Sequence, residues 1–205
     1  PERPGEGHTA KGAGGAGSRP EIGIQGRFAK SEFDDGSYVK GHNCNTSLLG
    51  HFGTTGGYRV ERYVDKAGHE CAYYDSTLLF PGNIAAPNGP GVFVLDMTNP
   101  AKPVLTDTLT TPAMLSPHES MRVNQKRGLI AAGQGSPGTE PAFVDVYDIS
   151  VDCRKPVMKS SLPMGVFGHE SAFAPDGKTF YVTGTAAPTL VAIDLTDPSK
   201  PQPVW

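Results

Sequence analysis

The chain has 205 residues, of which 37% are hydrophobic and 8% aromatic, with 26 glycines and 19 prolines. Glycine and proline at these levels are typical of a protein built from many short strands and turns. The formal net charge is −3 and no basic stripe stands out, which argues against nucleic acid as a partner because phosphate binding needs clustered Lys and Arg. No run approaches about 18 consecutive apolar residues, so we expect no membrane span.

The amino end, residues 1–40, differs in composition from the rest. Its run Lys11–Ser18 is rich in glycine and holds too little apolar surface to pack alone. We predict a flexible leader here, with an arm that wraps a propeller or a neighbouring molecule as the alternative. The first residue is Pro rather than Met, which we interpret as a mature product or a fragment.

Residues 41–205 repeat one pattern in three parts, residues 41–109, 110–162 and 163–205. Each part holds an alternating apolar segment that ends in Asp and leads into a proline-rich turn. These segments are Val92–Asp96, Phe143–Asp148 and Leu190–Asp194. Successive aspartates are 52 and 46 residues apart. We interpret Asp96, Asp148 and Asp194 as turn formers whose carboxylates accept backbone N–H bonds.

Further strands are predicted around these segments. Asp176-Gly177 between two β-rich runs is a hairpin signal, because glycine tolerates the positive φ of a tight turn. The more polar segments 104–109 and 157–162 suit the outermost, edge-like strand of a sheet. No apolar stripe of helical period extends beyond two turns, so the predicted class is all-β.

The dipeptide His-Glu forms a second landmark with the same period. It occurs at residues 69–70, 118–119 and 169–170, in steps of 49 and 51 residues. A period near 50 is typical of one four-stranded propeller blade. The predicted architecture is therefore a β-propeller of four-stranded blades, about three to three and a half of them in this chain.

These residues resemble a known family. A strand starting at His-Glu, followed by an apolar strand ending in Asp-(Leu/Met/Ile)-(Thr/Ser)-(Asp/Asn)-Pro-(Ser/Ala)-Lys-Pro, resembles the LVIVD-repeat β-propeller family of bacteria. The resemblance covers roughly residues 41–205 and is clearest at Asp96–Pro103 and Asp194–Pro201, while Val151–Arg154 departs from it. It implies a secreted or surface-attached propeller, and the family mostly lacks an assigned activity.

The number of blades raises a question of closure. Propellers close with about four to eight blades, so three and a half cannot complete a ring in the usual way. We interpret the chain as part of a larger propeller, with two copies meeting in one circle as the alternative. The expected partners are therefore the rest of its own propeller, a missing fragment or a second copy.

The repeated dipeptide also carries the candidate chemistry. If the three copies occupy equivalent places around one axis, His69, His118 and His169 can bind a divalent transition metal. Glu70, Glu119 and Glu170 are then candidates for a polar site in the central channel, because consecutive residues of a strand point to opposite sides. One alternative is structural, with each imidazole bonding to a neighbouring blade. Another is direct acid–base catalysis.

Three cysteines leave one without a partner. Cys44 and Cys71 are 27 residues apart and fall on neighbouring strands of the expected register, so we predict a disulfide between them. A disulfide implies an oxidising compartment. Cys153 is left over, and a thiol metal ligand is the functional alternative.

Two functions follow from the sequence. The first is a secreted, periplasmic or cell-surface propeller that binds a protein or glycan, or acts as a scaffold, without chemistry. The second is a metal-dependent hydrolase or oxidoreductase that uses the His-Glu positions. The fold cannot choose between them.

Overall fold

The computed structural model describes residues 18–19, 27–53, 57–76, 91–135, 141–165, 168–184 and 190–204. It divides into two compact units, residues 1–49 and 50–205. The glycine-rich run lies outside the described residues apart from Ser18, and His8 lies outside them too. Within the described part, no helix is long and apolar enough to cross a membrane.

Unit 1 has local structure organised by one arginine. It contains helix α1 (Lys30–Asp34) and a 3₁₀ turn η1 (Ser37–Lys40). The Arg19 guanidinium donates to the carbonyls of Ser37 and Gly41 and pairs with the Glu32 carboxylate at 2.9 Å. The described residues of the predicted leader are therefore not featureless.

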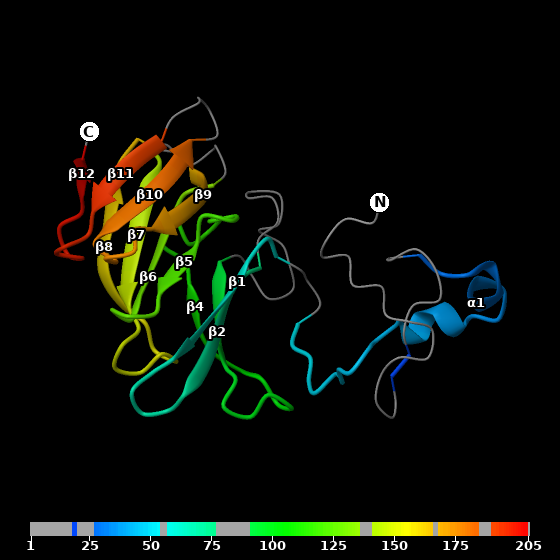
Figure 1. Cartoon of the computed structure of the whole chain (residues 1–205). Coiled ribbons are helices and arrows are strands. Elements are labelled where there is room, and N and C mark those ends of the chain that lie inside the picture. The colour runs from blue at the N-terminus through cyan, green and yellow to red at the C-terminus, as the bar shows by residue number, and fades with distance from the viewer. Residues whose placement is uncertain are drawn as a thin grey trace. The chain divides into compact units, whose positions relative to one another are not determined.

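Unit 2 is an all-β array (Figure 1). Its described residues form three four-stranded antiparallel sheets, in each of which the spatial order of the strands follows the chain. Sheet 1 consists of β1 (Val60–Val64), β2 (Glu70–Asp75), β3 (Val92–Asp96) and β4 (Val104–Leu109). Sheet 2 consists of β5 (Arg122–Asn124), β6 (Leu129–Gly133), β7 (Phe143–Asp148) and β8 (Val157–Pro163). Sheet 3 consists of β9 (Gly168–Phe173), β10 (Thr179–Gly184), β11 (Leu190–Asp194) and β12 (Gln202–Val204).

The first strands of the three sheets are neighbours in space. β5 contacts both β1 and β9, so these inner strands line up across the array. β4, β8 and β12 lie at the opposite edges, and the residues of β4 and β12 are mostly exposed, as the polar outer segments predict. Three successive antiparallel sheets are consistent with a β-propeller-like fold.

The aspartates at the ends of β3, β7 and β11 behave as predicted. Their carboxylates accept the backbone N–H two residues later, from Thr98, Ser150 and Thr196, at 2.9, 2.9 and 2.7 Å. The hairpin prediction at Gly177 is also confirmed, since this residue has φ +71° in the turn between β9 and β10. These turns end each strand at the same place in its sheet.

Apolar side chains fill the spaces between the sheets rather than one centre. The first cluster joins sheets 1 and 2 and includes Cys71, Tyr73, Val92, Val94, Ile130, Ala132 and Tyr147. The second joins sheets 2 and 3 and includes Ala131, Val144, Val146, Phe180, Val182 and Ile193. Because side chains alternate between the two faces of a strand, the middle sheet contributes to both clusters.

The disulfide prediction was wrong. Cys71 on β2 is bonded to Cys153, in the turn between β7 and β8, across 82 residues of sequence. Cys44 lies in unit 1 and is not part of this bridge. The prediction relied on strands that follow each other in the chain, whereas packing of sheet 2 on sheet 1 brings a distant turn against β2. The Tyr73 hydroxyl donates to the Cys153 carbonyl at 2.7 Å in the same contact.

Candidate functional site

The inner strands bring four charged side chains from three sheets together. Arg122 of β5 donates to Glu170 of β9 at 2.5 Å and to Glu61 of β1 at 3.2 Å. Arg59, just before β1, contacts the same two carboxylates at 3.2 and 3.5 Å. Burial raises the pKa of the Glu61 carboxyl, although Arg59 opposes the shift. We call these four residues the inner ion-pair network.

Three aromatic rings gather beside this network. The Tyr58 ring stacks on His118, with ring centroids 4.5 Å apart and an interplanar angle of 27°. His118 meets His169 edge to face at 6.1 Å. Tyr58 precedes β1, His118 precedes β5 and His169 lies in β9, so each sheet supplies one ring. Two of the three predicted imidazoles are therefore close together.

The backbone holds His118 in an uncommon conformation. Its φ is +50°, a left-handed value that costs energy in a residue other than glycine and is found often at functional sites. Ser120 fixes the segment, because its hydroxyl bonds to the carbonyls of Pro117 and Gly133. Gly135 lies against the ring so closely that a Cβ there would fall 2.8 Å from His118 Cγ.

Glu119 supplies a carboxylate to the same place. Its Oε2 lies 3.5 Å from His169 Nδ1, is buried, and has no hydrogen-bond partner among the described residues. One ligand atom from each of His118, Glu119 and His169 can be chosen so that all three lie within 4.8 Å of one another. We call these three residues the His-Glu-His cluster.

Burial lowers the pKa of His118, and the neighbouring His169 lowers it further, while the Glu119 carboxylate opposes both effects. The imidazole is therefore held in its neutral form. A neutral ring nitrogen is what a metal ion requires, since a protonated one has no lone pair to donate.

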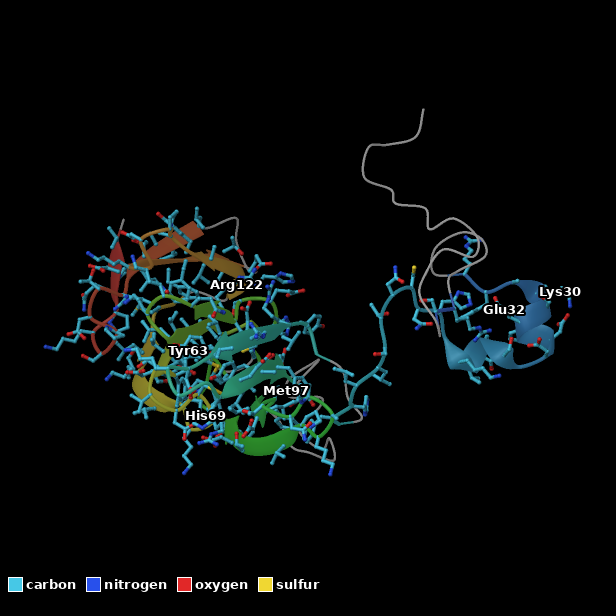
Figure 2. All side chains as sticks on the ribbon, turned by 60° about the horizontal axis from the view of Figure 1, so that its bottom comes forward. Lys30, Glu32, Tyr63, His69, Met97 and Arg122 are labelled. Atoms are coloured by element: carbon cyan, nitrogen blue, oxygen red, sulfur yellow. A yellow bond between two sulfur atoms is a disulfide. The ribbon has the colours of Figure 1, made fainter. Side chains whose placement is uncertain are left out.

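The first His-Glu copy does not join this cluster. His69 Nδ1 lies 2.9 Å from Asp65 Oδ2 and 4.0 Å from Asp152 Oδ1, in a separate group of potential ligands. Glu70 is paired with Arg62 at 2.5 Å. In Figure 2 the labelled His69 and Arg122 lie apart, with Tyr63 between them.

The expectation of three equivalent copies was therefore wrong for residues 69–70. His69 and Glu70 stand at the start of β2, the second strand of its sheet, whereas the other two copies stand at or just before the inner strands β5 and β9. A dipeptide marks the start of a strand without saying which strand of the sheet it starts. Counting four strands back from the end of each unit would have pointed to Tyr58-Arg59 as the first-sheet counterpart, which sequence reasoning missed.

The group around His69 is a structural junction. The Asp65 carboxylate accepts the backbone N–H groups of Ala67, His69 and Cys153, at 2.9, 3.0 and 3.1 Å. Burial opposes ionisation of Asp65, yet these bonds and the one from the His69 ring hold its pKa below the ordinary value. Its oxygens are thus already engaged in joining sheet 1 to the turn that carries Cys153.

Comparisons with known proteins show the fold and no family. No protein-family model matches the chain, and no curated protein matches it. Among solved structures, the chain is similar to a Bacteroides uniformis protein whose assignment as a 6-phosphogluconolactonase is provisional. The identity is 9% and the TM-score 0.56, over 80% of this chain and 43% of that one. The chain thus spans less than half the length of the structure it matches, and the likeness concerns the fold alone.

Proposed function

We propose that the His-Glu-His cluster binds one divalent transition metal ion, which makes this chain a metal-binding module on a propeller-like scaffold. The observation that carries the proposal is the buried Glu119 Oε2, which has no hydrogen-bond partner among the described residues and faces two imidazoles. A buried carboxylate oxygen without a partner costs free energy. A cation shared with His118 and His169 would remove that cost.

The donor set suits the ion. Two imidazole nitrogens and one carboxylate oxygen are a common ligand set for Zn²⁺ in sites that keep a position open, and they also bind Fe²⁺. The site is reachable, because the His169 side chain is 57% exposed and that of Glu119 27% exposed. The neighbouring inner ion-pair network holds β9 against β1 and β5 and so keeps His169 near the other two ligands.

A binding role fits the surroundings better than catalysis. An ion with an open position can hold a donor group of a protein or glycan, and it can also activate water for hydrolysis. Hydrolysis needs a cation or N–H donors aimed at the developing negative charge. Arg59 and Arg122 are both engaged by Glu61 and Glu170, so neither guanidinium is free for that task. We therefore favour the binding or scaffold role over a hydrolase or oxidoreductase.

The location is proposed on separate grounds. The bond between Cys71 and Cys153 persists only in an oxidising environment. This supports a secreted, periplasmic or cell-surface protein, as the resemblance to secreted propellers also implies.

Calorimetric titration of the metal-free chain with Zn²⁺ tests the proposal. We expect one ion per chain, and we expect Glu119→Gln and His169→Ala each to weaken binding by more than about tenfold. His69→Ala is the matched control, because it removes an imidazole from the other group of potential ligands. Thermal unfolding of each variant shows whether the fold persists.

Two results would overturn the proposal. One is a wild-type chain that binds no stoichiometric Zn²⁺ while it is folded. The other is binding that is lost in His69→Ala and retained in Glu119→Gln. Under a purely structural role for His118 and His169, substitutions lower the unfolding temperature without any metal to lose.

A further inference from the structure

The two contacts between sheets use equivalent faces. In sheet 3, Ile193 precedes the last aspartate of β11 and pairs with Phe180 of β10. In sheet 2, Tyr147 precedes the last aspartate of β7 and pairs with Ile130 of β6. All four side chains pack toward the preceding sheet. We call this the upstream face of a sheet, and the opposite one, which receives the next sheet, its downstream face.

The same register identifies the upstream face of sheet 1. Leu95 precedes Asp96 and pairs with Ala72, and Tyr74 follows Ala72 on the same side of β2. β1 is the first strand described in unit 2, so no described strand packs on this face. Residues 50–53 cover one end of it, where Phe52 meets Phe93 edge to face.

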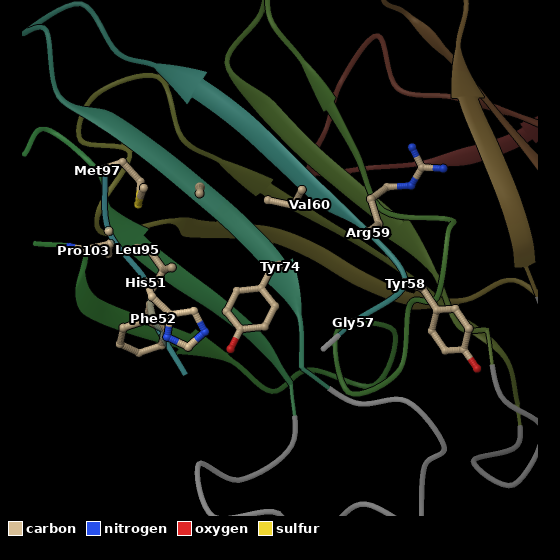
Figure 3. A pocket seen from close by; sticks show the side chains of 12 residues that line it. His51, Phe52, Gly57, Tyr58, Arg59, Val60, Tyr74, Leu95, Met97 and Pro103 are labelled. Carbon is tan, nitrogen blue, oxygen red and sulfur yellow. The ribbon is translucent and has the colours of Figure 1, made fainter. Parts of the chain in front are cut away.

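A pocket of about 450 Å³ remains on the upstream face of sheet 1 (Figure 3). It is lined by Gly50, His51, Phe52, Gly57, Tyr58, Arg59, Val60, Ala72, Tyr74, Leu95, Met97 and Pro103. Figure 3 shows the Tyr58 and Arg59 side chains pointing away from His51, Phe52 and Tyr74, so the lining near those three is mainly apolar and aromatic. Val60 beside it is 67% exposed, which is unusual for a side chain on the inner strand of a sheet.

Sheet 3 has the complementary open face. Tyr181 and Leu190 occupy the positions on its downstream face that Tyr73 and Val92 occupy in sheet 1. Tyr73 and Val92 are fully buried under sheet 2, whereas Tyr181 is 38% and Leu190 66% exposed. The chain therefore exposes both halves of the contact that it makes twice internally, one at each end of the array.

We infer that these two faces bind each other between two copies of this chain, with sheet 3 of one copy on the upstream face of sheet 1 of the other. The contact continues the pattern by which sheet 2 packs on sheet 1 and sheet 3 packs on sheet 2. Three sheets are too few to close a ring, since propellers hold about four to eight, but two copies supply six. A head-to-tail contact that closes in this way gives a symmetric dimer.

Sedimentation analysis of the full chain tests the dimer, with Val60→Glu and Leu190→Glu as variants. The wild type is expected at twice its 21.6 kDa mass. Each variant alone is expected as a monomer, because a carboxylate would be buried in every contact it makes. Val151→Glu is the control, since this side chain is 82% exposed in the turn after β7 and belongs to neither face.

Mixing the two variants distinguishes the head-to-tail contact from other dimers. A Val60→Glu copy still has a normal sheet 3, and a Leu190→Glu copy still has a normal sheet 1, so the mixture is expected to regain one contact and associate. A monomeric wild type overturns the inference, as does an open ladder of higher species. Dissociation by Val60→Glu with no effect of Leu190→Glu also overturns it, because that result indicates a contact between two copies of sheet 1.

Discussion

Tyr58 and His118 stack face to face at 4.5 Å, although 60 residues separate them and they precede the inner strands of different sheets. The stack joins sheet 1 to the loop that carries the His-Glu-His cluster. It restrains the imidazole whose neutral nitrogen the proposed metal needs. Tyr58 is therefore a positioning residue for His118.

We predict that Tyr58→Ala weakens Zn²⁺ binding by about tenfold, the scale on which supporting residues act at metal sites. Tyr58→Phe keeps the ring and is expected to bind as the wild type does. Calorimetric titration of both variants measures the affinity, and thermal unfolding measures the stability. Equal affinities in Tyr58→Ala and the wild type would show that the stack does not position His118.

Gly135 offers a test from the other side of the ring. A Cβ at this position would lie 2.8 Å from His118 Cγ and 3.0 Å from the Ser116 carbonyl oxygen. Because the backbone oxygen cannot move freely, we expect Gly135→Ala to displace the imidazole, weaken Zn²⁺ binding and lower the free energy of unfolding by about 1–3 kcal/mol. Titration and denaturant unfolding check both effects. Unchanged values in the two measurements would contradict this geometry.

The disulfide should contribute much of the stability. It closes a loop of 82 residues between sheets 1 and 2, for which chain entropy gives about 4 kcal/mol. We expect the double variant Cys71→Ala with Cys153→Ala to lose about that much free energy of unfolding in urea. Cys44→Ala is the matched control and should change little. Peptide mapping without reductant that joins Cys44 to Cys71 would contradict the bridge directly.

Acid should weaken the junction around Asp65. Side-chain hydrogen bonds from Arg154 lower the pKa of Asp152 to about 2, and hydrogen bonds from Cys153, His69 and Ala67 outweigh burial to lower that of Asp65. A carboxyl whose folded pKa lies below its unfolded value of about 4 adds stability above that pH. The contribution is lost as pH falls from about 4 through the folded pKa.

Asp65→Asn should therefore lower the free energy of unfolding at neutral pH by about 1–3 kcal/mol, because it weakens three buried backbone hydrogen bonds. The variant should also lose stability less steeply than the wild type on acidification. Asp107→Asn, on the exposed strand β4, is the control. Denaturant unfolding across the acid range measures both slopes, and parallel curves would exclude the assigned role of Asp65.

Local patterns predicted the parts of this structure that local chemistry determines. The alternating segments that end at Asp96, Asp148 and Asp194 became the third strand of each sheet, because those carboxylates close the following turn. The polar segments became edge strands for a similarly local reason.

Other parts depend on how the sheets pack, which periodicity does not encode. His69 shares its dipeptide with His118 and His169 but starts a second strand rather than an inner one. Cys153 meets Cys71 because a turn of sheet 2 lies on β2. Tyr58 and Arg59 carry no repeated signature, and their part in the site follows only from the inner-strand contacts.

The central claim is that His118, Glu119 and His169 share one metal ion. Crystals grown with Zn²⁺ and measured on both sides of the zinc absorption edge test it most directly. The account predicts one anomalous peak within about 2.0–2.2 Å of a ligand atom from each of the three residues. A peak beside Asp65, His69 and Asp152, or no peak near Glu119, would contradict it.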